Sequence, residues 1–221
     1  MDWTALGLSL RLSLWTMLVL LPVGVGLGRL LAYGRFRGRG VVEALLALPL
    51  VLPPTVMGYY LLLAFGGQAP FGHLWRDLFG RSLAFSFEGL LLASVLFNLP
   101  FAIQPMQRAF ETIPREVREA ALCCGLSARR TLWRIELPLA WPGVVSAMVL
   151  TFAHTLGEFG VVLMVGGNIP GETRTIAIAI YDRVQALDTA AAGVMSAALL
   201  AVSLLAISLS YAAARRGSPH A

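Results

Sequence analysis

Five apolar stretches alternate with polar segments along this chain. The first is twenty residues long, and a helix of that length covers about 30 Å, the thickness of the hydrocarbon core of a bilayer. A cleaved signal peptide does not fit it, because its apolar region would span only about 7–15 residues. The pattern predicts an all-α integral membrane protein, one domain over residues 1–221, with five transmembrane helices. These spans are expected at about 12–31, 44–65, 88–110, 142–165 and 190–214.

Composition supports a membrane protein and explains the positive charge. Hydrophobic residues make up 57% of the chain and charged residues only 13%, against about 25% in soluble domains; the mean hydropathy is +0.75. The net charge of +5 does not indicate nucleic-acid binding, because the 17 basic residues gather between the apolar stretches. Positive charge beside a span marks its cytoplasmic side, so we expect the amino terminus outside and the carboxyl terminus inside. Arg29, at the inner end of the first span, is expected to extend its charge to the membrane surface.

The polar segment 111–141 lies between the third and fourth spans and is expected in the cytoplasm. Pro114 can begin a helix, and Gly125 can adopt the left-handed conformation that ends one. Ser127 is a suitable cap for a second helix that runs to about Leu137. The segment therefore predicts two short helices joined at a glycine, forming a docking surface. An amphipathic helix lying on the membrane is the alternative.

A motif of fixed spacing runs through this segment. It consists of Glu119, Ala120, Ala121, Gly125, Ile135, Leu137 and Pro138. The motif resembles the cytoplasmic signature of the permease subunits of binding-protein-dependent ABC importers. The resemblance implies that the first short helix sits in a cleft of a separate ATP-hydrolysing subunit, and that these residues carry the mechanical coupling. Cys123 and Cys124 depart from the usual pattern; we interpret them as packing residues in a reducing compartment.

The second and fourth spans contain residues that fit poorly in lipid. Prolines free backbone carbonyls that protein or a wet cavity must satisfy, and an unpaired carboxylate such as Glu158 costs several kcal/mol in a bilayer. We expect these helices to line a translocation pathway; a kinked packing helix without a wet face is the alternative for the second. The candidate pathway residues are Pro53, Pro54, Thr55, His154, Thr155, Gly157, Glu158 and Gly160.

These pathway residues are expected to have different roles. Glu158, within the fourth helix, should organise structure or gating through a hydrogen bond, with His154 one turn away as a partner. Direct contact with the substrate is the alternative. Gly157 and Gly160 should share one face and admit another backbone. The hydroxyls of Thr55 and Thr155 are candidates for holding an anion.

Three stretches resemble the molybdate permease family, close kin of the sulfate and thiosulfate permeases. They are residues 49–59, 156–160 and 168–176, which read PLVLPPTVMGY, LGEFG and NIPGETRTI. The resemblance implies a homodimer in a bacterial cytoplasmic membrane, two ATP-binding subunits that bind ATP and magnesium, and an outer oxyanion-binding protein. It also implies import of molybdate, or tungstate, by alternating access. A sulfate or thiosulfate permease, or a channel or scaffold that needs no ATPase, are the alternatives.

The sequence also argues against activity as an enzyme. The chain has neither a phosphate-binding loop nor any lysine, so it cannot be the ATPase. His73, His154 and His220 are far apart in sequence, and no catalytic or metal-ligating pattern is present. We therefore expect no cofactor and no metal site in this chain.

Overall fold

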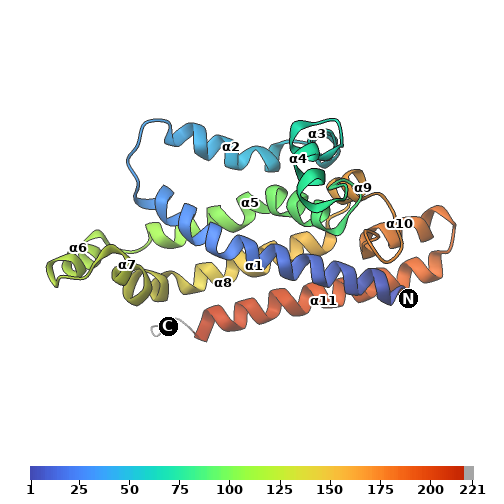
Figure 1. Ribbon diagram of the computed structural model, residues 1–221. Coiled ribbons are helices and arrows are strands. Elements are labelled where there is room, and N and C mark those ends of the chain that lie inside the picture. Colours follow the sequence, from blue (N-terminus) through green and yellow to red (C-terminus); the bar gives the residue numbers. More distant parts are fainter. Residues whose placement is uncertain (217–221) are drawn as a thin grey trace.

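The computed structural model describes residues 1–216, with side chains through residue 208. His220 lies outside this range. The described chain folds into helices and their connections (Figure 1). The helices are α1 Trp3–Tyr33, α2 Arg39–Val51, α3 Pro54–Phe65, α4 Pro70–Phe79, α5 Phe87–Glu111, α6 Arg115–Cys123, α7 Ala128–Thr131, the π-helical turn η1 Leu132–Glu136, α8 Leu137–Gly157, α9 Gly160–Gly166, α10 Ile176–Gln185 and α11 Thr189–Arg216.

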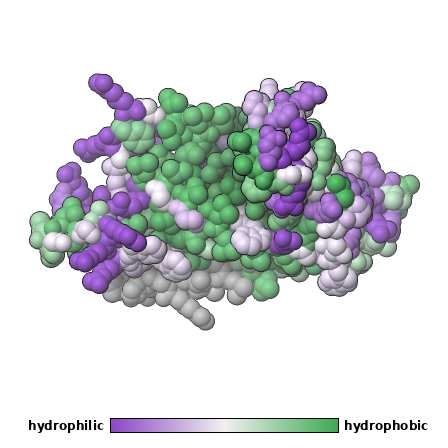
Figure 2. Space-filling view, in the orientation of Figure 1, coloured by the Kyte–Doolittle hydropathy of each residue, from purple (hydrophilic) through white to green (hydrophobic). Residues whose placement is uncertain are grey.

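Within the described residues, four helices are long and apolar enough to cross a membrane: α1, α5, the continuous helix Ala128–Gly157, and α11. A fifth span results if α2 and α3, which are bent by 111° relative to each other, count as one. Figure 1 shows the long helices side by side, with the amino terminus and the end of α11 at opposite ends of the bundle. In Figure 2 an apolar belt lies between two polar ends. The predicted all-α membrane architecture is confirmed.

Several helix boundaries differ from those expected, for local reasons. Helix α1 begins earlier, at Trp3, because the Asp2 side chain accepts a hydrogen bond from the Ala5 amide at 2.9 Å and caps it. The helix that begins after Ser127 does not stop near Pro138 but continues into α8. The π-helical turn η1 lies directly before Pro138 and widens the helix, which accommodates the proline ring. Two short helices also lie between the expected spans: α4 in the connection from α3 to α5, and α10 in the connection from α9 to α11.

The core of the bundle lies where α1, α5 and α8 meet. Met106 of α5 lies over Gly24 and Gly28 of α1, so these two helices approach closely. Toward the α6 end, buried apolar residues of α5, of the turn after it and of α8 form one continuous cluster. Its members are Met106, Phe110, Ile113, Ala140, Val144 and Ala147. This apolar cluster packs α5 against α8 at that end of the bundle.

Candidate functional site

Helix α6 extends beyond the ends of the long helices (Figure 1). It follows Pro114 and ends at Gly125, whose φ of +76° lies in the left-handed region. The Leu126 amide donates to the Ala121 carbonyl at 3.1 Å, and the Gly125 amide donates to the Leu122 carbonyl at 2.9 Å. This pair of bonds is the Schellman arrangement, which satisfies the last carbonyls of the helix. The predicted helix end at Gly125 is confirmed.

The two alanines of the motif lie on different sides of α6. Glu119, Ala120 and Gly125 are exposed, whereas Ala121 is only 4% exposed and packs against its own chain. Glu119 accepts a hydrogen bond from Arg115 Nε at 2.6 Å. Of the two alanines, Ala120 is therefore the one that a docked partner can approach.

The cysteines at the end of α6 are not packing residues. Both Cys123 and Cys124 are free and exposed. That interpretation is wrong because both side chains are exposed at the end of the protruding helix, where Cys124 is the C-terminal cap.

The second half of the motif belongs to the transmembrane bundle. Ile135 lies in η1, and Leu137 and Pro138 begin α8. Leu137 packs against the core cluster of Met106 and Phe110. These residues therefore lie where the segment that follows α6 enters a transmembrane helix, whereas Glu119, Ala120 and Gly125 are exposed on α6 and at its end.

Two helix breaks lie against each other in the bundle. The first separates α2 from α3, where Leu52 and Pro53 are extended, with ψ near 135°. The second separates α8 from α9 at Glu158 and Phe159, which leave the helical conformation. A Cβ built on Gly160 would lie 2.8 Å from Pro54 Cβ, so the two breaks are in close contact. The prolines of the second span thus coincide with a break, and the fourth span, which was expected to be one helix, is broken as well.

A recess with a volume of ≈ 580 Å³ opens beside the two breaks. Residues of both interrupted spans, α2–α3 and α8–α9, and of α5 line this recess. The lining residues are Pro54, Thr55, Phe97, Ala153, His154, Gly157, Glu158, Phe159 and Gly160. Six of the eight candidate pathway residues therefore meet here, from segments about a hundred positions apart.

A buried polar cluster supports one wall of this recess. Ser94 Oγ donates to Glu158 Oε2 at 3.2 Å, and Asn98 Nδ2 donates to the same oxygen at 3.4 Å. Asn98 Nδ2 also donates to the Ser94 carbonyl at 2.9 Å, and Asn98 Oδ1 lies 2.9 Å from His154 Nδ1. An amide oxygen only accepts, so Nδ1 of His154 carries the proton. The other oxygen of Glu158, Oε1, accepts no hydrogen bond from the described residues.

The cluster corrects three expectations about individual residues. Asn98, rather than Glu158, is the described hydrogen-bond partner of His154, so His154 and Glu158 are linked through the amide. Thr155 is buried and donates its hydroxyl proton to the Thr151 carbonyl at 2.8 Å, so its hydroxyl turns away from the recess. Gly157 and Gly160 do not share a helical face, because α8 ends at the first and α9 begins at the second.

Sequence reasoning missed Ser94 as a partner of Glu158 and missed the second helix break. Ser94 lies in an apolar run with nothing to distinguish it from a helix-packing serine. The break had a signal, because glycine is a poor helix former and Gly157 and Gly160 flank the two residues that leave the helix. Polar residues at Asn98 and Glu158 in separate spans were the only indication of a cluster.

Fold and site together define a multi-pass membrane protein with a protruding helix, α6, and with two interrupted spans that meet beside a recess. The family model described as "Binding-protein-dependent transport system inner membrane component" matches residues 24–216. The chain belongs to this family and is thus the membrane component of a transporter that works with a binding protein and an ATPase.

Relatives with full-length similarity carry a more specific description. The chain is 44% identical over 214 residues to the molybdenum transport system permease protein ModB of Azotobacter vinelandii, covering 97% of this chain and 95% of the relative. It is 37% identical over 208 residues to ModB of Escherichia coli K12, and the match covers 94% of this chain and 90% of that relative. A probable sulfate transport system permease protein of Chlorokybus atmophyticus is 32% identical over 181 residues, covering 82% of this chain and 63% of the relative.

Solved structures agree on the fold. A bacterial alginate ABC transporter, in complex with its alginate-bound periplasmic protein, superposes with a TM-score of 0.77 at 19% identity, over 96% of this chain and 78% of that one. The MetNI methionine ABC transporter in an inward-facing conformation gives a TM-score of 0.72 at 18% identity, and the match covers 98% of this chain and 94% of that one. At these identities the likeness establishes the ABC importer permease fold alone.

Proposed function

We propose that this chain is the permease subunit of an ATP-driven importer of molybdate. The observation that carries the proposal is the near full-length similarity to relatives named as molybdenum transport permeases, at 44% and 37% identity. The sulfate-permease relative is less similar and matches over a shorter length, so sulfate is the second candidate substrate.

The α6 end of the bundle faces the cytoplasm in this proposal. Most of the 17 basic residues lie in the connection after α1, in the segment from α5 to α8, and at the end of α11, which matches the positive-inside pattern. This orientation places the amino terminus outside and the carboxyl terminus inside. It also places the exposed Glu119, Ala120 and Gly125 where an ATPase subunit can dock.

The pathway in this proposal runs between two copies of the chain. One copy has too few spans to enclose a pore, and the ≈ 580 Å³ recess is walled by α3, α5, α8 and α9 of a single subunit. A second copy would complete the pathway through two-fold symmetry. Thr55, which is exposed, and His154 present the polar groups of the recess wall, while the hydrogen-bonded Glu158 fixes the break between α8 and α9.

The mechanism we propose is alternating access. ATP binding closes the two ATPase subunits and moves the docked α6 helices. Because α7, η1 and α8 form one continuous helix from Ala128 to Gly157, a displacement at its first turn is carried to the break at Glu158. The recess beside that break then changes its access from one side of the membrane to the other.

Uptake of labelled molybdate tests the substrate. The chain is co-expressed with its neighbouring ATPase and binding protein in cells that lack their own importer, with excess sulfate as competitor. ATP-dependent uptake that resists sulfate is the expected result. If excess sulfate suppresses the uptake of molybdate, the protein is a sulfate permease subunit. If molybdate enters without ATP, the protein is a channel.

Substitution of the free surface of α6 tests the coupling assignment. Gly125→Val forces a β-branched residue into the left-handed region, and Glu119→Arg reverses an exposed charge. Both variants should remain in the membrane as folded subunits but lose transport. Arg183→Gln, which removes only an exposed ion pair with Asp188, is the control. Normal uptake by both α6 variants would remove the assignment.

A further inference from the structure

A buried carboxylate lies where the docking helix meets the bundle. The side chain of Glu136 is 1% exposed and belongs to the π-helical turn η1, immediately before α8. A charge in such a place is strongly disfavoured unless ionic partners compensate it. Single π-helical turns inside α-helices occur frequently at functional sites. Glu136 occupies the variable position between Ile135 and Leu137 of the motif, so the motif itself does not account for it.

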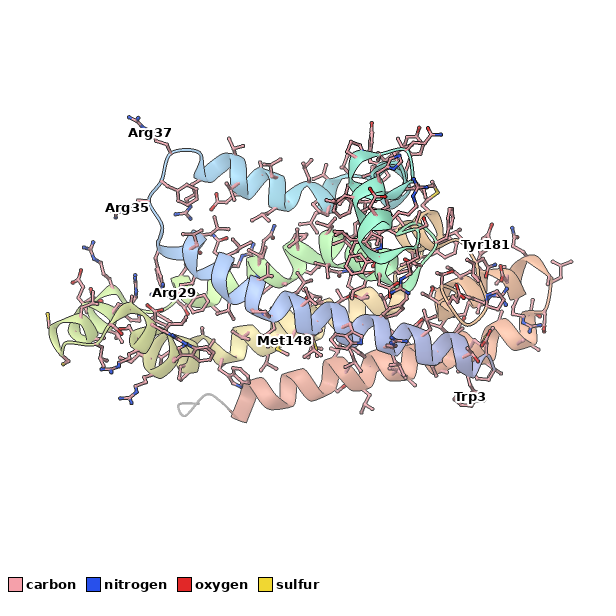
Figure 3. The ribbon with its side chains drawn as sticks, viewed as in Figure 1. Trp3, Arg29, Arg35, Arg37, Met148 and Tyr181 are labelled. Carbon is pink, nitrogen blue, oxygen red and sulfur yellow. The ribbon has the colours of Figure 1, made fainter. Side chains whose placement is uncertain are left out.

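Two arginines from different helices compensate this carboxylate. Arg29 of α1 donates from Nε to Oε2 at 2.5 Å and from Nη2 to Oε1 at 3.3 Å. Arg118 of α6 donates from Nε to Oε1 at 3.1 Å. Figure 3 shows Arg29 at the end of α1 that lies closest to α6 and α7. Arg29 was expected to extend its charge to the membrane surface; its side chain is 28% exposed, and its guanidinium pairs with the buried Glu136.

Tyr33 extends the same cluster to a further helix. The guanidinium carbon of Arg118 lies 3.3 Å from the centre of the Tyr33 ring, a cation–π contact. The Tyr33 hydroxyl donates to the Phe110 carbonyl of α5 at 2.8 Å. One side chain of the docking helix, Arg118, is thus fixed to α1 and η1 directly and to α5 through Tyr33.

The rest of α6 is weakly attached. Ala121 is its one buried residue, and its other ion pair, Arg115 with Glu119, is exposed and lies within the helix itself. Chain connectivity joins α6 to α5 and α7, but not to α1. Arg118 is the residue through which α6 engages α1, through the shared carboxylate of Glu136 with Arg29 and through the ring of Tyr33.

We propose that Glu136 is a positioning residue that transmits the movement of α6 to α1 as well as to α8. The inference rests on the proposed function, because it assumes that an ATPase moves α6. Displacing α6 alone would separate Arg118 from a buried carboxylate, so α6, α1 and η1 move as one unit. Removal of the link leaves ATP hydrolysis intact but weakens its conversion into transport.

The first test measures the attachment of α6 without any transport. The sequence has two cysteines, so Cys124→Ser leaves Cys123, at the end of α6, as the single site for a spin label. In the full chain in lipid nanodiscs, the label should become more mobile in Arg118→Met and in Glu136→Gln. Arg118→Lys, which keeps the charge, should restore the original spectrum. Arg115→Gln, which removes only the exposed pair on the same helix, is the matched control and should leave mobility unchanged.

The second test measures coupling in the complete complex in proteoliposomes. Molybdate taken up per ATP hydrolysed should fall by at least about fivefold in Arg118→Met, the lower end of typical coupling between sites. Arg118→Lys should recover most of the ratio, and ATPase copurification should be unaffected. Arg118→Met keeps the Arg29–Glu136 pair, so it remains informative if Glu136→Gln fails to fold.

The outcomes separate this inference from the proposed function. Unchanged label mobility in Arg118→Met, or an unchanged uptake ratio, would overturn the role of the cluster even if the wild-type complex imports molybdate. If the wild-type complex imports sulfate instead, the substrate proposal fails, but the mobility test and the sulfate-per-ATP ratio still decide the role of Glu136.

Discussion

Two regions of the bundle differ sharply in what holds their helices together. Where α1, α5 and α8 meet, toward the α6 end, the contact is apolar and close, with Met106 lying over Gly24 and Gly28. Where α3 meets α9, the backbone is broken on both sides and a recess with a buried carboxylate lies alongside. Apolar packing therefore supports the structure in one region, and hydrogen bonds from neighbouring helices support the other. A broken helix in a membrane protein is tolerated where protein or a cavity satisfies its polar groups.

Proline by itself does not cause these breaks. Pro22, Pro49, Pro100, Pro105 and Pro142 all lie inside helices that continue past them. The adjacent pair Pro53–Pro54 differs because each proline disfavours the helical conformation of the residue before it. Leu52 and Pro53 are both extended as a result, which turns the chain by 111°.

Replacing the proline pair should have the largest effect. Pro53→Ala combined with Pro54→Ala favours a continuous helix by up to roughly 3 kcal/mol per position. A straightened α2–α3 would withdraw Thr55 from the recess, so oxyanion uptake should fall by at least about tenfold while the folded protein is retained; each factor of ten corresponds to about 1.4 kcal/mol. Uptake in proteoliposomes measures this. Pro49→Ala, inside α2, is the matched control, and equal uptake by both variants would show that the break is not needed.

The two breaks also differ in how far the sequence predicts them. Apolar run lengths were sufficient to predict the transmembrane architecture, and Pro53–Pro54 predicts the first break because its cause is local. The second break and the cluster around Glu158 depend on Ser94 and Asn98, which lie about sixty positions away in another helix. The same holds for Glu136, whose partners Arg29 and Arg118 come from two other helices. A single sequence contains no pattern that shows which of its distant segments are in contact.

Truncating the apolar contact should be the most destabilising single change. Met106→Ala removes a side chain that is 1% exposed and fills the space between α1, α5 and α8. Large-to-small substitutions of buried residues cost roughly 2–5 kcal/mol. Thermal unfolding in detergent should show a clear decrease in the melting temperature. Leu200→Ala, where the leucine is 60% exposed on α11, should leave it almost unchanged. Similar melting temperatures for both variants would contradict the assignment of this contact as the core.

Removing the central amide of the polar cluster should cost less. Asn98→Ala leaves Glu158 and His154 without a shared partner, and an unsatisfied buried polar group costs roughly 1–3 kcal/mol. Ser13→Ala is the control from the uninterrupted region, because the buried Ser13 hydroxyl donates only to the Ser9 carbonyl of its own helix at 2.9 Å. Thermal unfolding should separate the two variants. If Ser13→Ala is the more destabilising, the polar cluster does not support the broken region as described.

The smallest expected effect is a difference in melting temperature between alanine substitutions of the two glycines that flank the second break. Gly160→Ala places a Cβ 2.8 Å from Pro54 Cβ, in a proline ring that cannot rotate away, so α3 and α9 must separate slightly. Overpacking of this kind costs on the order of 1 kcal/mol, or about 2–4 °C in melting temperature for a chain of this size. A Cβ on Gly157 meets no described atom outside its own stretch of helix within 4 Å, and alanine favours the last turn of α8, so Gly157→Ala should be neutral or slightly stabilising. Because both variants add one methyl group at positions three apart, their difference reports the contact between the breaks alone. Equal melting temperatures would mean that α3 and α9 do not touch at Gly160, and the two breaks would then be independent features of the fold.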